Sequence, residues 1–191
     1  TIGPDSLVES STIENGVSFV RSVCYSSNIL SGADIGPFVR IRPGSVIGKS
    51  VHVGNFVELA IKGFYDNLKF HRYVPGFVIQ GGCPNTRDLD SAQVIEAAGN
   101  PWAGLGTGGP GYCIKQEYTT NPNNSHEDGA LAMARSANPD SAGSQFYLCL
   151  GPQHNLDSGY TVFGQTIEGK DVIGELRVGD VIETIEIENA D

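Results

Sequence analysis

The sequence predicts a mainly β protein in which a short-repeat segment precedes a strand-rich domain. Apolar residues recur every six positions in the first third of the chain, and apolar strand-like stretches follow at 70–82 and 146–150. The composition agrees, because 39% hydrophobic residues, 25 glycines and 18% charged residues are typical of a folded β-rich protein and not of a disordered chain. With 191 residues, the chain can bury one large core or two small ones.

The N-terminal repeat has a period of six. Its repeat position is occupied by Ile35, Ile41, Ile47, Val53 and Leu59. A short fixed period predicts stacked coils, and the glycines that follow three of these residues, Gly36, Gly48 and Gly54, suit tight corners. Strand alternation is a simpler explanation of even spacing, but it does not predict those glycines. Roughly three coils are marginally stable alone, so trimerisation or docking onto the rest of the chain would supply the remaining stability.

The junction GNFVELAIKG, residues 54–63, has two interpretations. As a coil it continues the burial of Val53 and Leu59. As a helix it places Phe56 and Leu59 on one face and ends at Gly63, a favourable C-terminal glycine. The sequence alone leaves both interpretations open.

Two strand sequences follow the junction. In PGFVIQGG, alternation places Val78 and Gln80 on one face and Ile79 on the other. In GSQFYLCL, alternation places Gln145 and Tyr147 on one face. The core side of this second strand is then formed by Phe146, Leu148 and Leu150.

Three further segments have less regular sequences. Residues 83–105 predict a surface loop, in which AQVIEAA forms one or two helical turns and Trp102 packs back on the barrel or borders the substrate. GTGGPGY, residues 106–112, lacks the Lys-Ser/Thr pair and the helix of a phosphate-binding loop, so we expect a backbone turn near the substrate groove. VIETIEIE, residues 181–188, alternates well enough to be the strand that closes the barrel.

Charge and hydropathy exclude two classes of partner. A net charge of -10 with twelve scattered lysines and arginines argues against nucleic acid. No apolar run approaches the roughly 20 residues of a membrane span, and Thr1 does not begin a signal peptide, so no membrane is expected. The four cysteines form no CxxC pair, and Cys149 predicts a buried free thiol, so a reducing cytoplasm is the expected compartment.

Arg72 lies on strand sequence in which alternation turns the neighbouring His71 away, so its own face has no acid, base or nucleophile beside it. A rigid, permanently charged donor suits the stabilisation of a twisted amide and not the cleavage of a bond. Taken alone, Arg72 is explained more simply as half of a surface ion pair. His71 is expected to face away from the site, and His52, His126 and His154 lack metal-ligand spacing, so we expect structural or exposed histidines and no metal.

Four blocks in this order resemble the cyclophilins, a family of peptidyl-prolyl cis-trans isomerases. They are FHRYVPGFVIQGG (70–82), GTGGPGY (106–112), GALAMARSANPDSAGSQFYLCL (129–150) and NLDSGYTVFGQTIEGKDVI (155–173). The resemblance covers residues of about 55–189 and implies a closed β-barrel with two helices. It also implies rotation about Xaa-Pro bonds in proline-containing peptides and unfolded proteins, without a cofactor, and hence assistance to protein folding.

The same resemblance assigns the site. It makes Arg72 the donor to the twisted amide and Gln80 the residue that holds the substrate backbone, as the catalytic pair. The substrate-binding residues that it implies are Phe77, Val78, Ala134, Gln145, Tyr147, Leu156 and Tyr160. Val78 and Tyr147 stand where many members have Met and Phe, changes that keep an apolar wall, and Tyr160 replaces a histidine of eukaryotic members.

Residues 1–59 resemble a different family, through IGPFVRIRPGSVIG and VHVGNFVEL. That family is the bacterial bifunctional N-acetylglucosamine-1-phosphate uridyltransferase/glucosamine-1-phosphate acetyltransferase, in its left-handed β-helix. The chain is therefore interpreted as a chimera of a hexapeptide-repeat segment, 1–54, and a cyclophilin-like domain, 55–191, that lacks its usual first two strands. We expect residues 12–30 to supply strands that complete the barrel. Acetyltransferase activity is not expected, because the lysine after NFVE and the later coils of that site are absent.

Two alternatives stand beside an active isomerase. One is a catalytically impaired peptide-binding or oligomerisation module, in which an incomplete barrel no longer positions Arg72. The other is an engineered chimera with no evolved role. The assembly is expected to be a monomer or a homotrimer mediated by the β-helix.

Overall fold

The computed structural model describes residues 55–100 and 102–187 without a break. Before Asn55 it describes positions 2, 6–15, 17–19, 23–25, 28–29, 34–35, 40–41, 46–47 and 52–53. The chain divides into two compact units. The first consists of residues 1–62, 119–122 and 186–191, and the second of residues 63–118 and 123–185.

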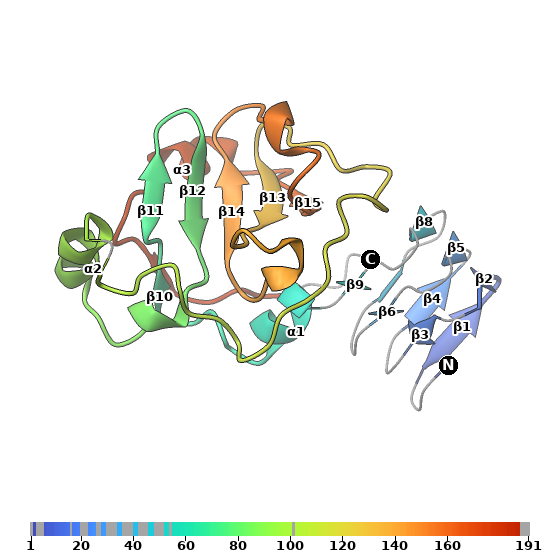
Figure 1. The fold of residues 1–191 in the computed structure, drawn as a ribbon. Helices are drawn as coiled ribbons and strands as arrows, with labels where there is room; N and C mark the ends of the chain where they lie inside the picture. The colour runs from blue at the N-terminus through green and yellow to red at the C-terminus, as the bar shows by residue number, and fades with distance from the viewer. Residues whose placement is uncertain are drawn as a thin grey trace. The chain divides into compact units, whose positions relative to one another are not determined.

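Short parallel strands form three sheets in the first unit (Figure 1). One sheet contains β1 (Leu7–Glu9), β4 (Val23–Tyr25) and β7 (Arg40–Ile41). The second contains β2 (Thr12–Ile13), β5 (Asn28–Ile29) and β8 (Val46–Ile47), and the third contains β3 (Ser18–Phe19), β6 (Asp34–Ile35) and β9 (His52–Val53). Successive strands along the chain therefore belong in turn to the first, the second and the third sheet.

Each pairing in these sheets joins strands three places apart along the chain, and in the pairings of β5 with β8 and of β6 with β9 the offset equals three six-residue periods. Leu7 lies opposite Val23 and Asp34 lies opposite His52, so each strand pairs with the strand three places further along the chain. When one turn of a coil contains three repeats, equivalent positions of successive turns lie side by side in this way. Ile29, on β5, is fully buried, as an apolar repeat position requires.

The strands within residues 12–30 do not complete a barrel. β2, β3, β4 and β5 pair in parallel with β5, β6, β7 and β8, which belong to the same unit. Among the described residues, none of them pairs with a strand of the second unit. The prediction is wrong for these strands because pairing between repeats already satisfies their backbone groups.

The junction starts as a strand and continues as a helix. β9 ends at Val53 and α1 spans Asn55–Ile61, which confirms the helical interpretation for this stretch. Glu58 in the first turn pairs with Lys62 four residues later, a pairing that supports a helix by about 0.2–0.5 kcal/mol. Gly63 has a φ of +66°, the left-handed conformation of a glycine that ends a helix.

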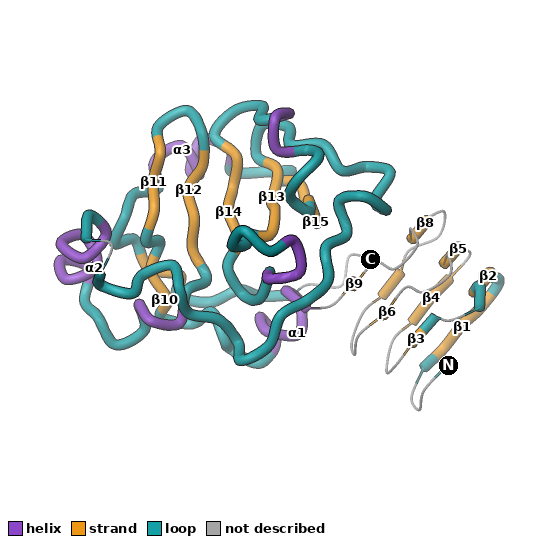
Figure 2. Tube along the Cα trace, viewed as in Figure 1, coloured by secondary structure: helices purple, strands orange, loops and turns teal. Residues whose placement is uncertain are grey.

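The second unit is organised around a five-stranded antiparallel sheet (Figure 2). Its order is β11 (Arg72–Val74), β12 (Val78–Gly81), β14 (Phe146–Cys149), β13 (Ala130–Met133) and β15 (Val162–Gln165). Arg72 lies opposite Gln80, and Gln80 lies opposite Tyr147. Directly opposite residues share a face of the sheet, so the register brings three predicted site residues into one row.

The strand expected at 181–188 is much shorter in the structure. β16 spans Val181–Ile182 and pairs antiparallel with β10 (Leu68–Lys69) in a separate two-stranded sheet. The described strands therefore do not form one closed barrel. At one end of the pairing between β10 and β16, the N–H of Asn67 donates to the carbonyl oxygen of Ile182 at 2.8 Å. The pairing stops there because the φ of +62° at Asn67 turns the backbone out of the extended conformation.

Three α-helices are present in the described residues, where two were expected. Besides α1 they are α2 (Ser91–Ala98) and α3 (Lys170–Glu175), and short 3-10 helices lie at η1 (Pro84–Thr86), η2 (Pro139–Ser141) and η3 (His154–Leu156). α2 is the helical turn predicted in AQVIEAA. It begins with a capping box, in which Asp90 and Gln93 each bond the backbone N–H of the other at 2.8 Å. No helix in the described part of the chain has the length and apolar character to cross a membrane.

Trp102 follows α2 and does not pack back on the sheet. Its side chain is 93% exposed, so the predicted packing is wrong. The turn that carries it therefore holds the ring in solvent.

Both faces of the five-stranded sheet carry buried side chains at its centre. On one face the ring of Phe146 makes edge contacts with Tyr65 and Phe70, at centroid distances of 5.5 and 6.3 Å. The other face contains Val78, Ala130, Ala132, Tyr147, Cys149 and Val162. The predicted alternation holds, but because β14 is the central strand, neighbouring Phe146 and Tyr147 are each 4% exposed on opposite faces.

Candidate functional site

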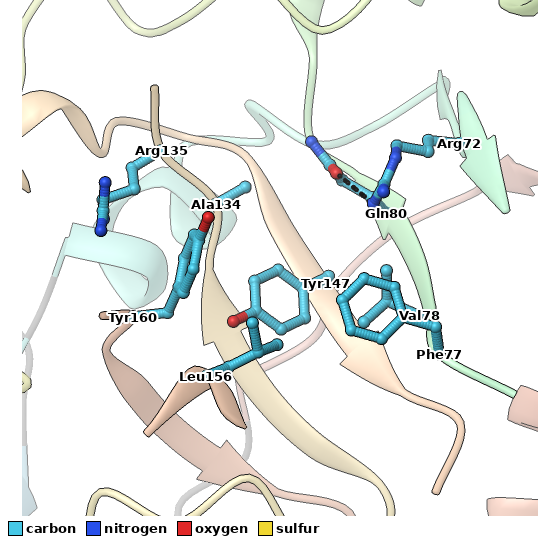
Figure 3. Close-up of a pocket in the computed structure, with 9 residues that line it drawn as sticks. All are labelled: Arg72, Phe77, Val78, Gln80, Ala134, Arg135, Tyr147, Leu156 and Tyr160. Carbon is cyan, nitrogen blue, oxygen red and sulfur yellow. Dashed lines mark hydrogen bonds between the residues drawn. The ribbon is translucent and has the colours of Figure 1, made fainter. Parts of the chain in front are cut away.

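A pocket of about 210 Å³ lies over the Val78 and Tyr147 face of the five-stranded sheet (Figure 3). Its lining residues are Arg72, Phe77, Val78, Gln80, Ala134, Arg135, Tyr147, Leu156 and Tyr160. Strands β11, β12 and β14 supply the floor, and the segments that follow β13 and β14 supply the walls. Every predicted site residue except Gln145 therefore lines one pocket, although these residues are far apart in the sequence.

Arg72 stands at one side of the pocket with its guanidinium loosely held (Figure 3). Its Nη1 donates to Gln80 Oε1 at 3.5 Å, the upper limit of a hydrogen bond, and its Cζ lies 5.8 Å from the centroid of the Phe77 ring. The side chain is exposed. Most of its donor groups are therefore available to a ligand in the pocket.

Gln80 is held from behind by a second amide. Gln80 Nε2 donates to Gln145 Oε1 at 3.0 Å, and Gln145 Nε2 donates to the carbonyl oxygens of Gly106 and Gly108, each at 2.8 Å. Gln145 thus connects the GTGGPGY turn to Gln80, where the sequence predicted a turn near the groove. It supports the pocket without lining it.

An apolar surface forms the rest of the pocket. Figure 3 shows the Tyr147 ring between Leu156 on one side and Phe77 and Val78 on the other. The Tyr160 ring meets Tyr147 edge-on, with centroids 6.0 Å apart. These side chains present hydrocarbon to a ligand, as the sequence predicted.

Arg135 is a pocket residue that the sequence analysis did not identify. Its guanidinium lies 4.6 Å from the centroid of the Tyr160 ring and is anchored by bonds from Nε to Gly159 O (2.7 Å) and from Nη1 to Ser136 O (2.8 Å). Its position directly after Ala134 was the available signal. Alternation along β13 does not extend to Arg135, because the strand ends at Met133.

His71 is buried beside Arg72 but does not line the pocket, which agrees with the expected orientation. Within the described structure neither ring nitrogen has a hydrogen-bond partner. The pKa of His71 is lowered from 6.5 to about 4, mainly by burial and also by the charge of Arg72, whereas the neighbouring Gln145 amide opposes the change. The ring is therefore neutral at pH 7.

The free energy of unfolding should rise with pH between about 4 and 6.5 because of His71. In this window the unfolded chain binds a proton that the folded chain does not, so acidification favours unfolding by up to about 3 kcal/mol, and the effect is complete below the folded pKa. Urea unfolding at several pH values measures this slope. His71→Phe should flatten it and His154→Gln, at an exposed histidine, should not; an unchanged slope in His71→Phe would contradict the assignment.

The pocket is equipped for binding and orientation. Its described lining contains two guanidinium groups, one amide and apolar or aromatic side chains, but no carboxylate, thiol or imidazole. Nowhere in the described residues do three or more His, Cys, Asp or Glu side chains gather as a metal site would require. Such a lining stabilises one conformation of a bound group without making or breaking bonds.

Comparison with known proteins gives a consistent result. The family model for cyclophilin type peptidyl-prolyl cis-trans isomerases matches residues 49–190. Peptidyl-prolyl cis-trans isomerase B of Bacillus subtilis is 44% identical over 136 residues, which cover 71% of this chain and 81% of that protein. A peptidyl-prolyl cis-trans isomerase of Helicobacter pylori is 44% identical over 135 residues, which cover 70% of this chain and 71% of that protein.

Solved structures show the same likeness. A cyclophilin type peptidyl-prolyl cis-trans isomerase of Cryptosporidium parvum matches with a TM-score of 0.55 and 27% identity, over 72% of this chain and 83% of that chain. A structure of the same protein in the presence of the dipeptide Ala-Pro matches with a TM-score of 0.50 and 28% identity, over 68% of this chain and 77% of that chain.

Proposed function

We propose, because the chain belongs to the cyclophilin-type peptidyl-prolyl cis-trans isomerase family, that its pocket holds the proline of an Xaa-Pro bond while Arg72 assists rotation. The chain is accordingly a peptidyl-prolyl cis-trans isomerase. The assignment of the pocket as its active site is our proposal. The observation that carries it is the loosely held guanidinium of Arg72 beside a wall of apolar side chains.

Rotation about an Xaa-Pro bond needs selective stabilisation of a twisted amide. The planar amide resists rotation with a barrier of about 20 kcal/mol, and its nitrogen lone pair is delocalised. In the twisted state that lone pair becomes a hydrogen-bond acceptor, so a donor placed there stabilises the transition state and not the ground state. Arg72 is the donor that the pocket offers for this purpose.

Arg72 does not act alone in this proposal. A charge-assisted hydrogen bond contributes about 1.5–3 kcal/mol, far less than the barrier. The apolar surface of Phe77, Val78, Tyr147 and Leu156 contributes by excluding water from the proline ring and by fixing its position. No cofactor takes part in this mechanism.

The remaining residues bind the substrate on either side of the proline. Gln80, held by Gln145, is placed to bond the peptide backbone, and Ala134 and Tyr160 border the flanking residues. The substrates are proline-containing peptides and unfolded proteins. The structural relative solved in the presence of the dipeptide Ala-Pro supports this class of ligand.

Exchange NMR on a short Ala-Pro peptide tests the function. With catalytic amounts of the protein, magnetisation should transfer between the cis and trans resonances within seconds, whereas the free peptide isomerises over tens of seconds or longer at 25 °C. Line broadening without faster exchange would indicate the alternative, a peptide-binding module that has lost catalysis. Exchange rates equal to those of the free peptide, with no broadening, would contradict both.

For residues 1–54 we propose a hexapeptide-repeat segment of the left-handed β-helix type, followed by a cyclophilin-like domain at 55–191. Two observations support this proposal. Successive strands belong in turn to three parallel sheets, and each pairing joins strands three places apart along the chain. Such a segment either stacks within a monomer or forms a homotrimer. Sedimentation equilibrium of the full chain distinguishes these states, and a dimer would contradict both.

A further inference from the structure

A buried hydrogen-bond chain begins at the floor of the pocket and leads away from it. The Tyr147 hydroxyl lies 2.9 Å from His126 Nε2, and His126 Nδ1 lies 2.7 Å from Asp157 Oδ1. His126 is fully buried, and its ring stacks on Tyr147 with an angle of 14° between the planes. The sequence analysis treated His126 as a structural or exposed residue and did not connect it with the site.

The chemistry of the three groups sets the direction of these bonds. Asp157 Oδ1 also accepts the backbone N–H of His126 at 2.7 Å. Burial raises the pKa of Asp157, but the hydrogen bonds from His126 outweigh it and hold that pKa below its usual value. A carboxylate only accepts, so His126 Nδ1 carries a proton, which leaves Nε2 to accept from the Tyr147 hydroxyl.

The reverse arrangement is disfavoured by burial. If Nε2 donated, the Tyr147 hydroxyl proton would need another acceptor, and the described residues offer it none. A buried O–H group without an acceptor is unfavourable. The hydroxyl therefore points towards His126, and the pocket is presented with the hydrocarbon part of the ring.

Further hydrogen bonds beside His126 and Asp157 hold the wall of the pocket against its floor. Asp157 directly follows Leu156, and Asn124 Nδ2 donates to the carbonyl oxygens of Asp157 at 2.6 Å and of Tyr160 at 2.9 Å. The N–H of Gln153 donates to the carbonyl oxygen of His126 at 2.7 Å. The segment that carries Leu156 and Tyr160 is thus anchored to the loop before β13, and His126 links that loop to Tyr147.

We propose that His126 and Asp157 are positioning residues of the isomerase, which act by fixing the ring of Tyr147 as the floor of the proline pocket. Neither residue lines the pocket or touches the rotating bond. They orient Tyr147, a floor residue whose hydroxyl would otherwise be turned towards the apolar part of the site. This inference rests on the proposed function of the pocket.

Two variants test the proposal by their kinetics. Tyr147→Phe keeps the ring and removes the bond to His126, and Asp157→Ala removes the anchor of His126. When the Tyr147 ring is no longer fixed, the substrate loses contacts with it that are equally strong in the ground state and the transition state. KM should therefore rise about fivefold to tenfold, while kcat should stay within twofold of the parental value. A merely structural role would instead reduce the folded fraction, which lowers apparent kcat and leaves KM unchanged.

His154→Gln is the matched control. His154 Nδ1 also lies near Asp157, 3.2 Å from Oδ2, but its ring is exposed and does not reach Tyr147. This variant should retain the parental KM and kcat. A rise in KM in this control as large as in Asp157→Ala, or an unchanged KM in both test variants, would overturn the proposal.

A measurement on the unaltered protein keeps the proposal testable if a variant fails to fold. Long-range ¹H–¹⁵N NMR spectra distinguish the two neutral tautomers of a histidine, and His126 should show a protonated Nδ1 and an unprotonated Nε2. The opposite tautomer would overturn the inference. If the parent protein does not isomerise Ala-Pro peptides at all, the proposed function fails, whereas an active parent with the wrong tautomer refutes this inference alone.

Discussion

Replacement of Arg72 by alanine is expected to lower kcat/KM for an Xaa-Pro peptide about 100-fold. The guanidinium is the only strong donor beside the apolar wall that is not anchored by short bonds among the described residues of the pocket. Loss of one preorganised donor that acts in the transition state costs roughly 100-fold to 1,000-fold in rate. Exchange NMR at several peptide concentrations measures this change.

The way in which the two kinetic constants change identifies the role of Arg72. A bond made in the transition state alone lowers kcat and kcat/KM equally, whereas a bond to the ground state raises KM. Arg72→Lys should recover part of the activity, because lysine keeps the charge but lacks the rigid fork. Parental kcat in Arg72→Ala would refute the mechanism.

Arg177→Ala is the control for Arg72→Ala. Arg177 also lies over an aromatic ring, with its Cζ 4.6 Å from the centroid of Tyr73, but it is outside the pocket. Both arginines are exposed, so both variants should fold. Parental activity in Arg177→Ala would show that the loss in Arg72→Ala comes from the position of the guanidinium and not from the net charge.

Gly82→Ala is expected to reduce the free energy of unfolding by roughly 2–6 kcal/mol, through backbone strain and overpacking together. Gly82 has a φ of +81°, which an L side chain rarely adopts. A Cβ at this position would also collide with the carbonyl oxygen of Ser144 and lie 3.1 Å from the Cα of Gln145. Ser144 is buried and its Oγ donates to the carbonyl oxygen of Gly82 at 2.7 Å, so neither backbone can move freely.

Gly76→Ala separates the two causes. Gly76 has a φ of +67°, but a Cβ there would meet nothing within 4 Å. This variant should lose only the conformational part, about 1–2 kcal/mol, in urea unfolding followed by circular dichroism. Equal losses in Gly76→Ala and Gly82→Ala would show that the close approach of Ser144 does not limit stability.

Much of the candidate site was predictable from sequence because strand alternation is a local property. Alternation places Val78 and Gln80 on one face of β12 and Tyr147 on one face of β14 without knowledge of their partners. The resemblance of four blocks supplied residues outside the strands, such as Leu156 in the 3-10 helix η3. Arg135 was not predicted because β13 ends before it, so strand alternation did not indicate the direction of its side chain.

The incorrect predictions concerned contacts between distant segments. Residues 181–188 alternate throughout, but a strand extends only as far as its partner, and β10 offers two residues. Trp102 is apolar, but the turn after α2 leaves it in solvent. Strands within residues 12–30 pair in parallel with strands of the segment that follows, and the sequence of these strands does not by itself identify that partner.

The sequence by itself determined the features that arise from periods and backbone requirements within a few residues. These include the short strands of the repeat segment, the faces of the later strands and the glycine at positive φ, Gly63, that suits a helix end. Tertiary structure alone decided which strands pair, which face of each is covered, and how His126 joins Tyr147 to Asp157. The physical reason is that side-chain direction is set by local dihedral angles, whereas the hydrogen bond between His126 and Asp157 exists only once the whole fold has brought its two atoms to 2.7 Å.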